Sequence, residues 1–305
     1  MYHYVHDDAS APFPNLKSLG CSAFRNQVAF LKNNYRVISP FELLDAVENG
    51  SDLPPDSAVL TFDDGYRDHL VNVLPVLTES SLTAAFFPPV ASTKQESLLD
   101  VNKVQTLLAS TENHSKICEL IKQSFNEMNL KGEIGTDFQS FYNKLSAMSR
   151  FDNPDTTFVK RALQFGLPSR VRSQLLRELF RKHVTADEKS LAEEFYLSVN
   201  EIKQLRTEGM LIGAHGSSHV WMDTLSPEHQ DQEISQSLEL LSQVGASTDS
   251  WVFCYPFGGH NASLRQIAID KGCKLGLTTE ARVANLSVDS FMELPRLDTN
   301  DVATT

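Results

Sequence analysis

Two adjacent carboxylates at the end of an apolar run are the first residues of this sequence that could do chemistry. They are Asp63 and Asp64 in the stretch LTFDDGYRDHL, and the apolar run 58–62 leads into them. Asp and Gly are ordinary turn residues, so the triplet DDG alone is also typical of a surface turn. Like charges side by side repel each other, and the rest of the chain must supply whatever compensates for them.

A pair of histidines, His215 and His219 in HGSSH, follows another apolar run. In a helical turn, a spacing of four residues brings both imidazoles to one side, which suits chelation of a metal ion. Two histidines and one carboxylate, with open positions for water and substrate, make a catalytic site for zinc or a similar divalent ion. A lone HxxxH is more often a surface feature, but this chain also carries the aspartate pair. We therefore expect a metal site.

Short apolar runs alternate with segments of helical periodicity over most of the chain. The predicted strands are MYHYV, SAVLTF, TAAFFPP, MLIGAH, SWVFCYP, KLGLTT and FMEL, and segments such as SAFRNQVAFLKNN and NASLRQIAID lie between them. This alternation predicts an α/β fold in which helices cover a parallel sheet, and about seven strands favour a closed or distorted (β/α) barrel. In such barrels the chemistry lies at the carboxyl ends of the strands.

Polar residues gather at those predicted strand ends. The aspartates follow SAVLTF, the histidines follow MLIGA, the segment YPFGG follows SWVFC, and Arg296 with Asp298 follows FMELP. We expect one edge of the barrel to hold all of them.

The charge distribution separates a middle block from the rest of the chain. Residues 91–205 carry 16 of the 27 Lys and Arg and 15 of the 39 Asp and Glu, which leaves 11 against 24 elsewhere. Segments of this block, such as HSKICELIKQSFNEM, have the spacing of amphipathic helices. We therefore expect a barrel from residues 1–90 and 206–305, with a helical insertion at 91–205.

Composition limits the partners and the compartment. The chain has 305 residues, 41% of them hydrophobic, and a net charge of -12 that argues against binding nucleic acid. No apolar run approaches the roughly 20 residues of a membrane span, and the start MYHYVHDD has no basic and apolar leader. Four cysteines without metal-ligand spacing are typical of free thiols in a reducing compartment. The expected location is the cytoplasm.

Three motifs carry a family resemblance. TFDDGY, HGSSH and YPFG, in that order, resemble the polysaccharide deacetylase family, carbohydrate esterase family 4, whose fold is a distorted (β/α) barrel with an Asp-His-His metal site. The resemblance covers residues 1 to about 90 and 206–300, and the first two motifs together are highly specific.

The resemblance implies roles for individual residues. One divalent ion, expected to be zinc, would be held by Asp64, His215 and His219. Asp63 would be the general base. The third motif would bind substrate and oxyanion through Tyr255, Pro256 and Phe257, with the donor being the backbone N–H of Phe257, where the family usually has Tyr.

The sequence departs from the family pattern in two places. Cys254 stands where family members often carry the arginine that steadies the base, and we expect Arg296 to fill that role. The usual C-terminal Leu-x-His motif, the source of the general acid, is missing after residue 260. Some relatives look circularly permuted, so His3 in MYHYV is the expected acid, although a core or strand-edge histidine is the alternative. His69 and His260 are further candidates.

The expected reaction is removal of an N-acyl group, acetyl or formyl, from an amino sugar. The absence of an export signal favours an intracellular precursor of a surface polysaccharide, linked to a nucleotide or a lipid. Residues 159–182 have seven basic side chains and only Glu178 acidic, so Arg170 and Arg172 are candidate contacts to phosphate or a carrier. A solvated helix face or a contact between subunits of a homo-oligomer is the alternative.

Two other classes of function stay open at this stage. A barrel that binds sugar without turnover would fit the altered third motif. Such a barrel would be expected to lose a metal ligand or the base first, and this chain has all of these residues. An amidohydrolase acting on a non-sugar C–N bond, such as a cyclic ureide, would use the same metal site.

Overall fold

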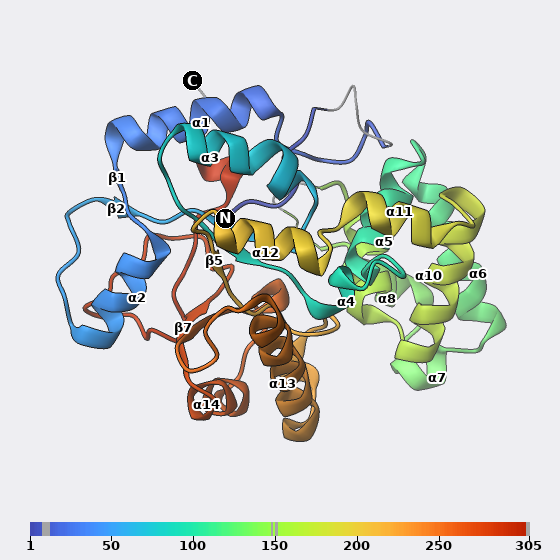
Figure 1. Cartoon of the computed structure of the whole chain (residues 1–305). Helices are drawn as coiled ribbons and strands as arrows, with labels where there is room; N and C mark the ends of the chain where they lie inside the picture. Colours follow the sequence, from blue (N-terminus) through green and yellow to red (C-terminus); the bar gives the residue numbers. More distant parts are fainter. Residues whose placement is uncertain (8–12, 148, 150–151, 303–305) are drawn as a thin grey trace. The chain divides into compact units, whose positions relative to one another are not determined.

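The computed structural model describes residues 1–7, 13–147, 149 and 152–302, which divide into two compact units (Figure 1). Within these limits, the first unit contains Met1–Asp7, Ser18–Ser97 and Lys189–Thr305. The second contains Leu98–Glu188 and the described residues of 8–17. Segments from both ends of the sequence, blue and orange to red in Figure 1, therefore contribute to the first unit. The division into a barrel and an insertion at residues 91–205 stays a prediction.

The strands of the first unit are short and parallel. One sheet has the order β3 (Thr61–Asp63), β4 (Ala85–Phe87), β5 (Leu211–Ile212), while β1 (Arg36–Val37) pairs with β2 (Ser57–Ala58) and β6 (Trp251–Cys254) pairs with β7 (Cys273–Leu277). Every residue of β3, β4, β5 and β6 is buried, which explains why their sequences read as continuous apolar runs rather than alternating ones. The mixed α/β architecture is confirmed, but the described strands form no closed sheet.

Isolated parallel bridges link the β3–β4–β5 sheet to the β6–β7 pair and link these two to segments near both ends of the sequence. Ala214 pairs with Phe253 between β5 and β6, and Leu277 of β7 pairs with Leu294. At the other side, Tyr2 pairs with Phe62 of β3. The carboxyl ends of β3, β5, β6 and β7 therefore belong to one connected network of parallel backbone segments.

The segments MYHYV and FMEL were expected to be strands, and that expectation is wrong for the described residues. They form isolated bridges instead: two in MYHYV, at Tyr2 and Val5, and one in FMEL, at Leu294. The physical reason is visible for the first: side chains take the carbonyls that a strand partner would use, since His69 bonds the His3 carbonyl at 2.9 Å and Asn72 bonds the Val5 carbonyl at 2.7 Å.

Helices pack against this parallel network. In the first unit they are α1 (Cys21–Asn34), α2 (Pro40–Asn49), the π-helix η2 (His69–Val73), α3 (Leu74–Glu79), α4 (Val90–Thr93), α11 (Glu188–Phe195, whose first residue belongs to the second unit), α12 (Val199–Thr207), α13 (Pro227–Val244) and α14 (Ala262–Asp270). The 3-10 turns are η4 (Met222–Thr224), η5 (Pro256–Gly258) and η6 (Thr299–Asp301). Capping boxes at Ser39 and Ser198 begin α2 and α12 by satisfying their first backbone N–H groups.

The core of the first unit is rich in stacked aromatic rings. The ring of Tyr2 stacks on Phe62 at 5.0 Å, and Phe62 stacks on Phe86 at 4.9 Å, so the rings form a row from the N-terminal segment across β3 to β4. Such pairs stabilise neighbouring strands beyond the area that they bury. This row underlies the carboxyl end of β3, where the aspartate pair begins.

The second unit is helical in its described residues. Its helices are α5 (Asp100–Ala109), α6 (His114–Glu127), α7 (Lys131–Ile134), α8 (Phe138–Leu145), α9 (Pro154–Arg161), the π-helix η3 (Ala162–Gly166) and α10 (Ser169–His183). They enclose their own apolar core, which includes Ile121, Phe158 and Leu163. No described helix of either unit is long and apolar enough to cross a membrane.

Candidate metal centre and active site

The aspartate pair lies where β3 ends and the chain turns sharply. Asp63 is the last residue of β3, and Asp64 and Gly65 both have a left-handed backbone, with φ of 70° and 69°. A Cβ on Gly65 would lie 2.7 Å from the Pro88 side chain, so glycine is required there for space as well as for φ. The turn directs the two carboxylates to different partners.

Several residues of this site have a positive φ, which is strained for residues that have a side chain. Among the described residues, seven that are not glycine have positive φ, and three of them are Asp64, His219 and Phe257. Such conformations cost energy for residues with a side chain and persist where the surroundings over-determine them.

Three potential metal ligands converge in the first unit. One Oδ of Asp64 lies 3.3 Å from His215 Nε2 and 3.1 Å from His219 Nε2, and the three side chains are almost completely buried. No described residue donates a hydrogen bond to this oxygen, Oδ1. A buried carboxylate oxygen that faces two imidazole nitrogens fits a divalent cation of the zinc type.

Neighbouring groups orient two of these three side chains, Asp64 and His215. Tyr66 donates its hydroxyl to Asp64 Oδ2 at 2.6 Å, which leaves Oδ1 for the histidines. His215 Nδ1 lies 2.6 Å from the Cys254 carbonyl and donates to it, so that Nε2 carries the lone pair. Burial and the nearby Asp64 raise the pKa of Tyr66 well above its ordinary value, and Tyr66 therefore stays a donor.

The loop between the histidines corrects one expectation. Residues 215–219 form a bend and not a helical turn, and Gly216 has a φ of 70°. The two imidazoles still approach each other, with ring centroids 4.9 Å apart. The spacing thus brings the ligands together through a loop whose shape other residues must hold.

Asp63 has its own cationic partner. Arg296 donates Nη1 to Oδ1 at 2.9 Å and Nη2 to Oδ2 at 2.8 Å, a two-point pair in which both side chains are buried. The guanidinium also bonds the Thr278 carbonyl, Thr61 Oγ1 and Cys254 Sγ. Burial alone would raise the pKa of Asp63, but the charge and hydrogen bonds of Arg296 outweigh it and hold that pKa below its ordinary value.

His3 lies beside this pair. Its Nε2 is 4.0 Å from Asp63 Oδ2, and its side chain is 40% exposed, so the ring reaches both the carboxylate and solvent. His69 is completely buried, and burial lowers its pKa. Its Nε2 forms a hydrogen bond with the His3 carbonyl. This geometry favours a structural role for His69, which holds the segment that carries His3.

The third motif contributes backbone and aromatic surface. The Phe257 ring stacks on Trp221, with centroids 4.9 Å apart and nearly parallel planes, and packs edge-to-face with His219, with centroids 4.6 Å apart. The N–H groups of the next two residues donate to the Tyr255 and Pro256 carbonyls. The Tyr255 ring is buried and its hydroxyl bonds the Met292 carbonyl at 3.0 Å, so its side chain belongs to the core.

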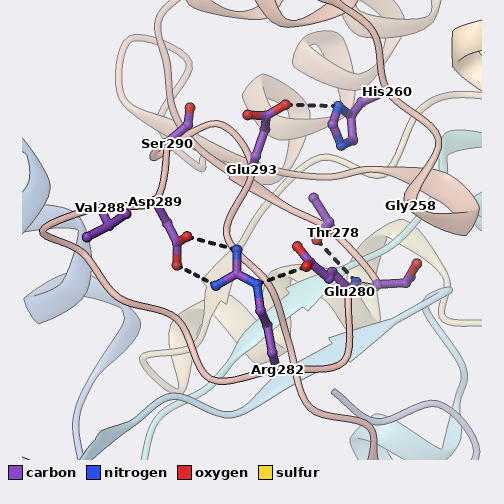
Figure 2. A pocket seen from close by; sticks show the side chains of 10 residues that line it. Gly258, His260, Thr278, Glu280, Arg282, Val288, Asp289, Ser290 and Glu293 are labelled. Carbon is purple, nitrogen blue, oxygen red and sulfur yellow. Dashed lines mark hydrogen bonds and ion pairs between the residues drawn. The ribbon is translucent and has the colours of Figure 1, made fainter.

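A polar cavity of about 720 Å³ lies beyond Gly258 (Figure 2). Figure 2 shows Arg282 between Asp289 and Glu280, and Glu293 beside His260. His260 Nδ1 also lies 2.9 Å from Arg265, which leaves this histidine in a network of its own. The cavity adjoins the third motif through Thr279, whose hydroxyl bonds the Phe257 carbonyl at 3.3 Å.

The two arginines proposed as phosphate contacts belong to the second unit. Arg170 pairs with Glu133 at 2.6 Å on the surface, and Arg172 makes a long bond to the Leu167 carbonyl at 3.4 Å. Their role stays a prediction.

Sequence reasoning missed two participants in this site. Tyr66 is part of the TFDDGY motif, and its position two residues after Asp64 was the available signal. Cys254 was noted only as a missing arginine, yet its carbonyl orients His215 and its sulfur accepts from Arg296. A backbone carbonyl leaves no signal in a sequence.

Comparison with known proteins identifies the class. The profile of the family described as polysaccharide deacetylase matches residues 50–132 and 173–276, more than half of the chain. This chain belongs to the polysaccharide deacetylase family.

Individual relatives are more distant. A poly-beta-1,6-N-acetyl-D-glucosamine N-deacetylase of Escherichia coli is 35% identical over 88 residues, which is 28% of this chain and only 13% of that protein. The deacetylase PplD of Streptococcus pyogenes has a similar fold, with a TM-score of 0.56, 18% identity, and coverage of 97% of this chain and 89% of the other. IcaB from Ammonifex degensii gives a TM-score of 0.56 at 15% identity, with the same coverage.

Removing one histidine should weaken metal binding if these three ligands hold the ion. We expect His215→Ala to lose at least tenfold in zinc affinity, because one of three protein ligands is gone. Equilibrium dialysis with elemental analysis measures this, and His229→Ala, on the exposed start of α13, is the matched control. Undiminished metal in His215→Ala would refute the assignment.

Removing Arg296 should destabilise the first unit in a way that depends on pH. Because the folded pKa of Asp63 is depressed, the pair stabilises the fold above the unfolded pKa, and that stability is lost as pH falls. Arg296→Met would leave a buried unpaired carboxylate and cost about 3–5 kcal/mol at pH 7, with a smaller loss below about pH 4.

Urea unfolding followed by tryptophan emission measures this loss, since both tryptophans, Trp221 and Trp251, lie in the first unit. Asp63→Asn with Arg296→Met should recover part of the stability. The control is Arg282→Met, which removes an arginine that is 42% exposed and pairs with Asp289. Equal stability of wild type and Arg296→Met at pH 7 would contradict the buried pair.

Proposed function

We propose that this protein is a metal-dependent hydrolase that removes an N-acyl group, acetyl or formyl, from an amino sugar. One observation carries the proposal: two adjacent buried carboxylates have different partners, the histidine pair for Asp64 and Arg296 for Asp63. This separation supports a role in binding a cation for Asp64 and a role in proton transfer for Asp63. Family membership supports the sugar amide as the target.

Asp64, His215 and His219 would hold the ion, which we propose to be zinc. A bound divalent ion would polarise the acyl carbonyl and lower the pKa of a water molecule. A carboxylate is a weak base, so it can take a proton only from water that has been acidified in this way. Asp63 is such a base, because Arg296 keeps it ionised at neutral pH.

The remaining steps fall to residues around Asp63. Asp63 would take a proton from water, and the resulting hydroxide would attack the acyl carbon. The backbone N–H of Phe257 would stabilise the oxyanion, since the neighbouring N–H groups are occupied. His3 would donate a proton from Nε2 to the departing amine, and its half-exposed ring allows it to be reprotonated from solvent.

The architecture that we propose for the first unit is a distorted barrel. The isolated bridges at Tyr2, Ala214 and Leu277 support it, because they join the N-terminal segment, the β3–β4–β5 sheet, the β6–β7 pair and the segment of Leu294 in one parallel order. The N-terminal segment also bonds the segment after Leu294: the Met1 amine donates to the Leu297 carbonyl at 2.6 Å. His3 and Arg296 thus lie on segments that bond each other, which supports the proposed permuted order.

The substrate class is proposed from the relatives and the cavity. The Escherichia coli relative is named for poly-N-acetylglucosamine, so an N-acetylated glucosamine polymer is one candidate, and a nucleotide-linked or lipid-linked precursor is another. A cavity of about 720 Å³ beside the third motif is of the size that ligand sites have. Arg170 and Arg172 stay candidates for contact with a phosphate-bearing carrier.

The direct test is turnover by zinc-loaded protein on a panel of free, polymeric, nucleotide-linked and lipid-linked N-acetylated amino sugars, with product masses as the readout. We expect Asp63→Asn to keep the metal but lose about 10²–10⁴-fold in kcat, because an amide cannot accept the water proton. Asp231→Asn, on the surface of α13, is the control. Equal activity in Asp63→Asn would remove it as the base, and turnover of non-sugar amides alone would redirect the proposal to that class.

The role of His3 has a separate signature in the pH profile. We expect His3→Ala to weaken the alkaline limb of kcat and reduce turnover by about 10²-fold, because the amine must then leave without an acid. His6→Ala is the matched control, since His6 lies on the same segment but pairs with Asp68. An unchanged profile in His3→Ala, with a large loss in His260→Ala, would reassign the acid.

A further inference from the structure

The loop between the two histidines is held by a carboxylate from a different helix. Glu233, in α13, accepts the backbone N–H of Ser217 at 2.7 Å and of Ser218 at 2.9 Å, both on Oε2. Its other oxygen accepts the Ser218 hydroxyl. Three donors of the residues directly between His215 and His219 therefore end on one side chain.

The opposite side of the same loop is fixed by backbone. Val90 N–H donates to the Gly216 carbonyl at 3.2 Å, and Ala91 N–H donates to the Ser217 carbonyl at 2.8 Å. The loop is thus bonded through its carbonyls to the start of α4 and through its N–H groups to Glu233. It has no helical hydrogen bonds of its own that could set its shape.

The position of Glu233 is itself well determined. Ile234 next to it is completely buried, and Gln230 in the preceding turn bonds the Met222 carbonyl at 2.9 Å. Hydrogen bonds from N–H groups to a carboxylate are shorter and stronger than neutral ones. A rigid helix therefore presents a charged acceptor to a loop that includes a left-handed Gly216 and ends at a left-handed His219.

We propose that Glu233 is a positioning residue that sets the separation and direction of the two metal-ligating histidines. This inference rests on the proposed function, since it assumes that His215 and His219 bind a metal. Glu233 acts through Ser217 and Ser218 and reaches neither ligand directly. Residues that orient ligands in this way typically account for a 10–100-fold change in metal affinity.

The chemistry of the side chain sets the pattern among variants. In Glu233→Gln the amide oxygen can still accept both N–H groups, and its NH₂ can donate to the Ser218 hydroxyl, so the loop keeps its shape. In Glu233→Asp the carboxylate retracts by one methylene and cannot reach both N–H groups at hydrogen-bond distance. Glu233→Ala removes all three bonds.

The test measures zinc dissociation constants by chelator competition, and the visible absorption of cobalt(II)-loaded protein as a report on ligand geometry. We expect Glu233→Ala and Glu233→Asp to weaken zinc binding 10–100-fold and to alter the cobalt bands, while Glu233→Gln stays within a few-fold of wild type with its bands unchanged. Glu239→Ala, a carboxylate on the same helix with no hydrogen bond or ion pair among the described residues, should match wild type.

The outcomes separate this inference from the proposed function. If wild type binds zinc and both Glu233→Ala and Glu233→Asp keep its affinity and cobalt spectrum, the inference about Glu233 is overturned and the metal site stands. If wild type binds no metal, the inference about Glu233 and the proposed function fail together. Tryptophan emission checks folding, and should Glu233→Ala not fold, Glu233→Asp gives the same decision.

Discussion

Two buried carboxylates next to each other in sequence are the constraint on which this site depends. Neither Asp63 nor Asp64 could stay ionised in the protein interior without a compensating charge, because burial and mutual repulsion both oppose ionisation. The left-handed backbone at Asp64 separates the two side chains. Asp63 then meets Arg296, and Asp64 meets the histidines.

These partners come from distant parts of the sequence, so the parallel arrangement of strand ends is needed to bring them together. Arg296 is 233 residues away from Asp63, and the histidines follow β5. Cys254, at the end of β6, touches both halves of the site: its carbonyl accepts from His215 Nδ1 and its sulfur accepts from Arg296. A shift of β6 would therefore disturb the proposed metal ligand His215 and the proposed base Asp63 together, and the third motif follows directly from the same strand end.

Much of this site was predictable because its residues carry chemistry in their type and spacing. The aspartate pair, the histidine pair and Arg296 all follow apolar runs, and the structure brings the five side chains together: the aspartates and histidines follow β3 and β5, and Arg296 follows the bridge residue Leu294. The shape of the HGSSH loop was predicted wrongly, since spacing alone cannot distinguish a helical turn from a bend held by other groups. Nothing in the sequence pointed to the contact between Glu233 and the HGSSH loop. A glutamate in an amphipathic helix is expected to face solvent, and its bonds to Ser217 and Ser218 appear only in the folded chain. MYHYV failed as a strand because side chains of η2 take its carbonyls, which periodicity does not reveal.

The central claim is that Asp64 binds the ion while Asp63 is reserved for proton transfer. A second group, Asp63 with His215 and Cys254, also brings potential ligand atoms within 4.8 Å of one another, so the two arrangements make different predictions for the same protein. Anomalous diffraction at the zinc edge from crystals of zinc-loaded protein decides between them. The account predicts one peak at about 2.0–2.2 Å from Asp64 Oδ1, His215 Nε2 and His219 Nε2, with Arg296 still bonded to Asp63. A peak coordinated by Asp63 and Cys254, or no peak at the histidines, would contradict it.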